Sequence, residues 1–355
     1  MNEHLHHVWS YNDVDRRFWQ EHLEDFVPHD IYDAHTHVNS PELRLEQMTD
    51  EKRRQYWVNE VLEPISADDA DRCHRIVYPG RKFSCLAMGM PDLSYDIKGG
   101  NEDLRLGCER YGWDALAVIS PHWSRQEVLA AIDHPRVIGV KPYYAMIGQD
   151  PTSRDKYLEA DIFDFLPHHQ LEVLNARGSW VTLHVPKSAR LGHASNISQI
   201  RRIREQYPDI TLVIAHLGRS YTLPHAQESL PLLAEDEGLY FDNSAVLNPQ
   251  VHRYALELLG PRRICWGTDN PIFYMRGRRT WSGRTYINLT SHPFHFNTNR
   301  QSPGIEATYT LYVYEAIRAI RQACEELGLS RDDVKNIFGG NARRWIAAIR
   351  ARHIA

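Results

Sequence analysis

The chain has 355 residues, of which 42% are hydrophobic and 25% are charged, with a formal net charge of −5 at pH 7. This length suits one large α/β barrel with insertions, or two smaller domains. The slightly acidic balance gives no electrostatic reason to expect nucleic acid as a partner. No apolar run approaches the roughly 18 residues that a membrane span needs, so no membrane partner is expected.

The first residues contain no basic segment followed by an apolar one, so the sequence predicts no secretory signal peptide. The five cysteines are scattered and form no Cys-x-x-Cys pair. An odd, dispersed set favours reduced thiols over a disulfide framework. We therefore expect a cytoplasmic protein.

Eight short apolar runs recur along the chain, and several are continuous rather than alternating, as in 212–215. Strands that are buried on both faces of a parallel sheet have this pattern. The predicted strands are Ile31–His37, Phe83–Met88, Ala115–Ser120, Val137–Lys141, Trp180–Val185, Thr211–His216, Leu239–Asp242 and Ile264–Thr268.

Segments with helical spacing separate these runs. Examples are Ser124–Ile132, Ile197–Tyr207 and His252–Leu259, the last of which ends at a Gly-Pro stop signal. Strands that alternate with helices predict a parallel sheet. Eight such units predict a (β/α)8 barrel of the TIM type, for which about 250 residues suffice. A doubly wound open sheet is the alternative.

The surplus of roughly 100 residues over a minimal barrel has identifiable places. An N-terminal extension, partly helical, covers 1–30, and long insertions follow strands one, four and eight at 39–82, 142–179 and 270–306. The last predicted helices are Ala307–Leu327 and Asp332–Arg352. We expect a single barrel domain over 1–355 with its core at 31–350. The insertions after strands one and eight suggest a lid or the contact of a homodimer.

Metal-capable side chains end several of these strands. His35 and His37 close the first strand, and residues at i and i+2 of a strand point to one face, about 7 Å apart. His184, His216 and Asp269 end the fifth, sixth and eighth strands. A lone histidine at a strand end is usually structural. Five metal-capable residues at matching ends, where barrel enzymes place their active sites, favour a divalent metal site.

These motifs together resemble the amidohydrolase superfamily. More narrowly, they are similar to the amidohydrolase-related group that includes aminocarboxymuconate semialdehyde decarboxylase and related metal-dependent hydrolases. The matching segments are Ile31–His37, Thr182–His184, Ile214–Gly218, Ile264–Pro271 and Asn336–Ala342. The resemblance spans residues 31–350, and it is specific for the superfamily rather than for a substrate.

The resemblance implies that His35, His37, His184 and Asp269 surround one divalent ion, Zn²⁺ first and Mn²⁺ as the alternative, with His216 beside them. Three imidazoles and a carboxylate leave room for water. A metal lowers the pKa of such a water from about 16 toward 7. Asp269 would then act as general base, and His216 would polarise the scissile carbonyl.

Lys141 ends the fourth strand, where some superfamily members carry a carbamylated lysine that bridges two metals. The alternatives are a salt bridge within the site or a contact to a substrate carboxylate, and a mononuclear site is the default. His122, Trp123 and Tyr143 also follow strands. They would line a pocket for a flat substrate, or else pack the barrel rim.

Arg276 begins an arginine-rich segment, 276–284, after the eighth strand. Arginine forks bind carboxylates, so a loop folded over the mouth would favour an anionic substrate. The alternative is a solvated loop.

The predicted function is that of a metal-dependent hydrolase, in which metal-bound hydroxide attacks an ester, lactone or amide carbonyl of a small acidic organic substrate. The alternative within the same group is a nonoxidative decarboxylase, a carboxy-lyase that would release CO2. A third reading is an inactive barrel used for binding, which predicts no bound metal.

Overall fold

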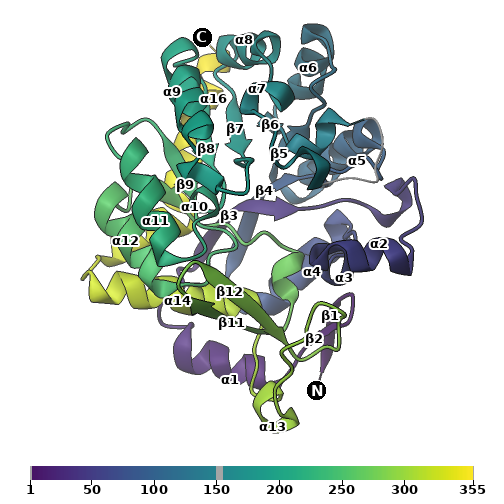
Figure 1. Cartoon of the computed structure of the whole chain (residues 1–355), viewed down its shortest axis with the longest axis vertical. Helices are drawn as coiled ribbons and strands as arrows, with labels where there is room; N and C mark the ends of the chain where they lie inside the picture. The colour runs from purple at the N-terminus through teal and green to yellow at the C-terminus, as the bar shows by residue number, and fades with distance from the viewer. Residues whose placement is uncertain (1, 149–154, 355) are drawn as a thin grey trace.

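Eight parallel strands form the central sheet of the computed structural model, which describes residues 2–148 and 155–354 (Figure 1). Each strand pairs with the next along the chain, from β3 to β10. Their bounds are β3 Asp30–His37, β4 Lys82–Met88, β5 Asp114–Val118, β6 Val137–Lys141, β7 Trp180–Leu183, β8 Thr211–Ile214, β9 Tyr240–Asp242 and β10 Ile264–Cys265. All eight predicted strands are confirmed, and several end earlier than predicted.

Backbone hydrogen bonds close this sheet on itself. The Ala34 N–H donates to the Trp266 carbonyl at 2.8 Å, and the His37 N–H donates to the Asn270 carbonyl at 2.7 Å. Thr36 and Asn270 form a parallel bridge between β3 and the chain that follows β10. The first strand therefore meets the last, and the fold is the predicted (β/α)8 barrel rather than a doubly wound open sheet.

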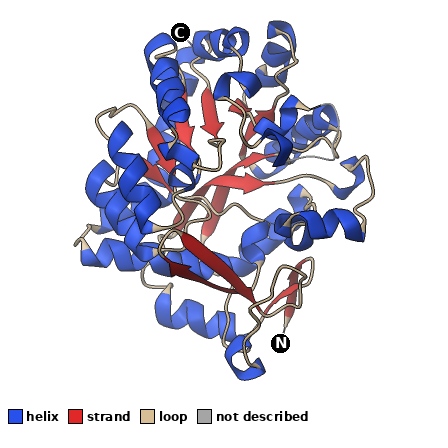
Figure 2. Ribbon diagram, viewed as in Figure 1, coloured by secondary structure: helices blue, strands red, loops and turns tan. Residues whose placement is uncertain are grey.

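Helices surround the strands (Figure 2). The three predicted examples are α6 Arg125–Ile132, α9 Ala194–Gln206 and α12 Pro249–Leu259. Ser124 begins α6 with a capping box, because its side chain accepts the Glu127 N–H while the Glu127 carboxylate accepts the Ser124 N–H. The other helices between strands are α4 Ala67–Val77, α5 Ile97–Tyr111, α8 His168–Ala176 and α11 Leu223–Ser229, and the short element α10 His216–Arg219 follows β8.

The extension and insertions contain both helices and hairpins. The N-terminal extension forms a hairpin of β1 Glu3–His6 and β2 Trp9–Tyr11, followed by α1 Asp13–His22. After β3 come α2 Asp50–Gln55 and α3 Trp57–Val61, and after β6 comes α7 Ile162–Phe165. After β10 the hairpin of β11 Gly277–Ser282 and β12 Thr285–Thr290 precedes α13 Pro303–Glu306. The arginine-rich segment is therefore a strand and turn, not a solvated loop.

The predicted C-terminal helix 332–352 is broken into α15 Arg331–Lys335, a π-turn at Asn336–Gly340 and α16 Asn341–Ile354. The Trp266 N–H, beyond the end of β10, donates to the Ile337 carbonyl at 2.8 Å. A Cβ on Gly339 would lie 3.1 Å from the Tyr32 Cβ. The break thus lets the backbone approach the barrel closely. The preceding helix, α14 Tyr312–Glu326, begins later than predicted.

An inner core of apolar side chains fills the barrel. Trp345 of α16 stacks on Tyr240 with ring centroids 4.0 Å apart and lies 5.7 Å from the ring of Trp180. Tyr240 and Trp180 begin β9 and β7, so α16 covers the amino ends of the strands. The inner core consists of Tyr32, Ala34, Leu86, Met88, Leu116, Ile138, Trp180, Val213, Cys265, Ala342, Trp345, Ile346 and Ile349.

The five cysteines are all buried and none is disulfide-bonded. Among residues 2–148 and 155–354, no helix combines the length and the apolar character that a bilayer crossing requires.

Candidate metal centre and active site

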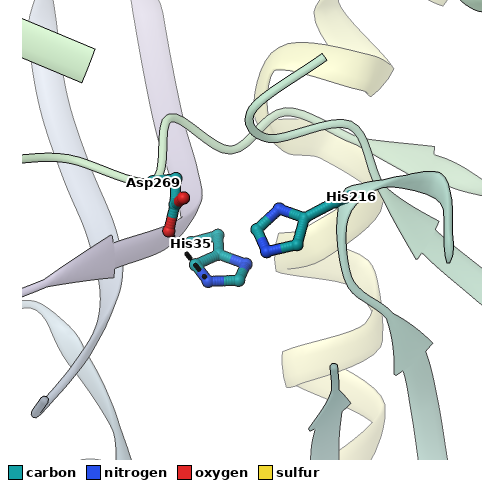
Figure 3. A group of neighbouring side chains, drawn as sticks. All are labelled: His35, His216 and Asp269. Carbon is teal, nitrogen blue, oxygen red and sulfur yellow. Dashed lines mark ion pairs between the residues drawn. The ribbon is translucent and has the colours of Figure 1, made fainter. Parts of the chain in front are cut away.

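A metal-capable cluster lies at the carboxyl ends of the strands. His35 is on β3, His216 follows β8, and Asp269 follows β10. Figure 3 shows these three side chains converging, and one ligand atom from each lies within 4.8 Å of the others. The arrangement could hold a metal ion. Segments as far apart as residues 35 and 269 thus meet at the predicted mouth.

His37 joins this cluster through Asp269. The Nε2 atoms of His37 and His35 lie 3.4 Å and 3.6 Å from Asp269 Oδ1. His184 lines the same cavity, and its ring centroid lies 5.2 Å from that of His216. All five residues predicted to build a metal site therefore surround one cavity.

Hydrogen bonds set the tautomers of the first two histidines. The His35 Nδ1 lies 2.9 Å from Asp242 Oδ2, and the His37 Nδ1 lies 3.0 Å from the Gly89 carbonyl. A carbonyl or carboxylate only accepts, so each Nδ1 carries the hydrogen and each Nε2 keeps its lone pair. Histidines that bind metals are typically oriented in this way.

His216 is held in the same tautomer. Its Nδ1 lies 2.8 Å from the Ser244 hydroxyl and 3.2 Å from the Ser244 carbonyl. The Ser244 hydroxyl donates its hydrogen to Asp242, whose other contacts include the His216 N–H at 2.9 Å. The Nδ1 of His216 is therefore a donor and its Nε2 is bare. A neutral His216 can therefore bind an ion or accept a proton at Nε2.

Asp242 and Ser244 were not among the residues predicted for the site. Asp242 is the last residue of the predicted seventh strand, so a signal was present in the position of an acid at a strand end. Ser244 lies two residues further on, and nothing in its local sequence marks it.

Burial controls the protonation of the cluster. It lowers the pKa of His216 to about 4. Burial, with the charge of Lys141, also lowers the pKa of His35. Burial alone would raise the pKa of Asp269, but the contact with His37 and the other nearby imidazoles hold it well below its usual range. His35 and His216 are therefore neutral imidazoles beside an ionised Asp269, the forms that bind a cation.

Several cavity residues adopt left-handed backbone conformations. His216, Leu217 and Arg219 have φ of 57°, 48° and 64°, and Gly218 between them has φ of 69°. The element α10 is consequently a left-handed turn. Asp269 also has a positive φ, 64°. Such conformations cost of order 1–3 kcal/mol at non-glycine residues and gather at functional sites. The turn explains why β8 ends at Ile214, before the predicted end at His216.

Lys141 and Tyr143, two of the predicted substrate-binding residues, line the cavity. The Lys141 side chain is buried, with its Nζ 3.3 Å from His35 Nε2. Tyr143 lines the cavity, and its hydroxyl donates to that of Tyr144 at 3.0 Å while the two rings stack. Tyr143 also lies edge-on to His184, with ring centroids 5.0 Å apart.

Three predicted substrate-binding residues do not reach this cavity. His122 is exposed, with its Nε2 2.9 Å from the Ile147 carbonyl. The Trp123 ring lies under the Lys98 ammonium group, whose nitrogen is 5.5 Å from the ring centroid. The Arg276 guanidinium is buried against Asp15, with one N–O distance of 3.0 Å. Its charge is neutralised inside the protein, so the geometry does not support the predicted role in substrate binding.

The cavity itself has a volume of about 140 Å³. Besides the metal-capable cluster, its lining includes aromatic and basic side chains, of which only Arg279 belongs to a segment singled out in the sequence. These are Tyr56, Trp57, Arg219, Tyr221, Phe273, Arg279 and Tyr286.

The chain was compared with curated proteins, solved structures and protein families. No curated protein matches the chain. A solved amidohydrolase from Burkholderia multivorans with bound Zn is 14% identical, with a TM-score of 0.56 over 89% of this chain and 99% of its own. A 5-carboxyvanillate decarboxylase from Novosphingobium aromaticivorans, complexed with manganese and 4-hydroxy-3-methoxy-5-nitrobenzoic acid, is 14% identical, with a TM-score of 0.53 over 91% of this chain and 97% of its own.

A third solved structure is a probable 2-pyrone-4,6-dicarboxylic acid hydrolase from Acinetobacter baumannii with bound citric acid. It is 14% identical, with a TM-score of 0.54 over 89% of this chain and 99% of its own. At this identity the three likenesses concern the fold.

The family model described as amidohydrolase matches residues 110–347, more than half of the chain. That stretch contains His184, His216 and Asp269, while His35 and His37 precede it and reach the same cavity through the closure of the barrel. The chain is therefore an enzyme that belongs to the amidohydrolase family.

Proposed function

We propose that this protein is a metal-dependent hydrolase that cleaves an ester, lactone or amide of a small acidic organic molecule. The observation that carries the proposal is the convergence of two lone-pair Nε2 atoms, from His35 and His37, on one oxygen of Asp269. Each of those imidazoles has its second nitrogen tied elsewhere. An ionised acid facing two imidazole lone pairs suits a cation better than a structural ion pair.

The ligands of one divalent ion would be His35, His37, His184 and Asp269. His216 also turns a bare Nε2 toward this group, which supports a role in binding the ion rather than in polarising a carbonyl. Imidazole-rich sets favour Zn²⁺, and Mn²⁺ is the alternative. The ion would supply a water of lowered pKa and polarise the substrate carbonyl.

The protein's own groups would manage the proton. Asp269 is ionised and partly exposed to the cavity, with 15% of its side chain accessible. It would take the proton of the attacking water as general base and return it to the leaving group. Lys141, beside His35, would hold an anionic oxygen of the substrate.

A nonoxidative decarboxylase is the second candidate. It is favoured by the structural likeness to a 5-carboxyvanillate decarboxylase and by the aromatic side chains around the cavity. The same ligand set would then hold a substrate carboxylate and an adjacent oxygen, and the product would be CO2.

Metal analysis followed by product analysis tests both candidates. The purified enzyme should contain about one equivalent of Zn or Mn per chain, and His184→Asn should lower it. Panels of lactones, esters and amides, and separately of aromatic carboxylic acids, should then be assayed by acid release and by CO2 release. Released CO2 without hydrolysis would favour the decarboxylase. Absence of metal after supplemented growth would contradict both.

A further inference from the structure

A second cluster faces the cavity, made of Arg219, Tyr221, Arg279 and Tyr286, here called the arginine–tyrosine wall. The Arg279 guanidinium lies 4.5 Å from the ring centroid of Tyr286 and 5.5 Å from that of Tyr221. The two tyrosine rings meet edge-on at 5.5 Å. None of these four residues has a part in the chemistry proposed above.

The positive charge of the wall is not neutralised by a neighbouring acid. Arg219 donates to the Val185 and Lys187 carbonyls, at 3.3 Å and 2.7 Å. Arg279 donates to the Ala245 carbonyl and to Asn288 Oδ1, both at 2.8 Å. Among the side chains that the structure describes, neither guanidinium forms an ion pair with a carboxylate.

A third guanidinium adds to this charge. Arg190 lies 5.4 Å from the ring centroid of Tyr221, on which Arg279 also packs. Burial, opposed by Tyr221 and Tyr286 but helped by the charges of Arg219 and Arg279, lowers the pKa of Arg190. Burying like charges together is costly unless an opposite charge joins them. The wall is thus complementary to an anion.

The hairpin β11–β12 brings this charge to the cavity. Successive residues of a strand face opposite sides, so Arg279 is buried with 6% exposure while its neighbour Arg278 is exposed. Tyr286 faces Arg279 from β12, where residue 286 pairs with 281. Arg276 of the same segment is used internally, against Asp15. Of the four arginines at 276, 278, 279 and 284, only Arg279 lines the cavity.

We propose that the arginine–tyrosine wall is a carboxylate-binding subsite, and that the substrate is a planar acid whose carboxylate lies on this wall while its reacting group faces Asp269. Arginine forks match carboxylates in geometry, and the tyrosine rings provide flat faces for a ring. The cavity of about 140 Å³ is close in volume to the roughly 150 Å³ cavity that binds benzene, so it limits the substrate to one ring. This inference rests on the proposed function for the position of the reacting group.

Calorimetric binding of benzoate to the metal-loaded protein tests the subsite. Arg279→Gln should weaken benzoate binding at least tenfold, whereas the matched variant Arg278→Gln, on the outer face of the same strand, should change it less than twofold. Benzamide, the neutral analogue, should bind at least tenfold more weakly than benzoate to the wild type. Equal benzoate affinity in Arg279→Gln and the wild type, or equal affinity for benzamide and benzoate, would overturn the proposal.

Two further variants keep the test decisive if Arg279→Gln does not fold. Arg279→Lys keeps the charge and loses the fork, and Tyr286→Ala removes one flat face from a partly exposed position. Each should weaken benzoate severalfold while the melting temperature stays within a few degrees. Unchanged affinity in both folded variants would refute the subsite.

Metal content and turnover, measured beside benzoate titrations with and without chelator, separate this subsite from the metal-dependent function. If benzoate binding still depends on Arg279 in a protein that never binds metal, the proposed function fails and the subsite stands. If the protein holds metal and turns over substrate while Arg279→Gln leaves benzoate binding unchanged, the subsite fails and the proposed function stands.

Discussion

The two ends of the barrel interior are built on the same eight strands but are filled in opposite ways. At the amino ends, Trp180, Tyr240 and Trp345 pack ring against ring over an apolar inner core. At the carboxyl ends, the ionised Asp269 and the buried Lys141 side chain lie among imidazoles. Apolar burial stabilises by about 25 cal/mol per Å², whereas buried charge costs free energy unless it is paired. Packing at the amino end thus contributes to the free energy of unfolding, whereas the buried polar groups at the carboxyl end need partners to offset their desolvation.

The largest effect is expected on turnover, at the carboxyl end. Asp269→Asn should keep the fold, because the isosteric amide preserves the packing, but it removes the proposed general base. Turnover should fall by roughly 10²–10⁴-fold, measured on whichever substrate the panels identify. The exposed Asp332→Asn, at 83% side-chain exposure, is the control and should leave turnover unchanged. An undiminished rate in Asp269→Asn would refute its role as base.

The next effect is on stability, at the amino end. Trp345→Ala removes a ring that contacts both Trp180 and Tyr240. Its free energy of unfolding should fall by about 3–5 kcal/mol, measured by urea denaturation, while metal content per folded chain stays constant. Ala348→Ser, exposed on the same helix, should change the free energy of unfolding by less than about 0.5 kcal/mol. A loss of metal without a loss of stability would contradict the division of the two ends.

A smaller effect, on metal affinity, is expected from a change at Asp242. This carboxylate orients His35 and accepts the backbone N–H of His216. Asp242→Asn should weaken metal binding by about 10–100-fold, measured by competition with a chelator of known affinity. Asp209→Asn, at 59% side-chain exposure, serves as the matched control. Wild-type metal affinity in Asp242→Asn would show that the His35 orientation does not depend on this acid.

The smallest effect concerns a buried histidine outside the mouth. His74 stacks on Phe83 with ring centroids 3.7 Å apart, and within the described chain neither ring nitrogen has a hydrogen-bond partner. Burial lowers the pKa of His74 to about 3. The unfolded chain, with a pKa near 6.5, takes the proton first as pH falls. Stability from this group is therefore complete above pH 6.5 and decreases toward pH 3.

Acidification from pH 7 to pH 5 should cost about 2 kcal/mol through His74 alone. Denaturation of the wild type and of His74→Phe at both values measures this, because the difference between the two proteins isolates one group from the other histidines. An identical pH dependence in both proteins would mean that His74 is not the buried neutral base described here.

The amino-acid sequence by itself determined the barrel and the places where polar side chains end its strands. Continuous apolar runs between helical segments mark strands buried on both faces, and that pattern is local to each segment. His35, His37, His184, His216 and Asp269 could be assigned to one mouth because parallel strands of a closed barrel bring their carboxyl ends together. Residues at the ends of different predicted strands could therefore be assigned to one site from the sequence.

The tertiary structure decided which partner each side chain takes. Arg276 and Arg279 lie three residues apart in one basic segment, yet one is neutralised by Asp15 and the other faces the cavity. The bare Nε2 of His216 depends on Ser244, and the break before α16 depends on Trp266. These contacts join segments distant in sequence. Short-range periodicity records how deeply a residue is buried, but it carries no information about which remote group will supply its hydrogen bond or counter-charge.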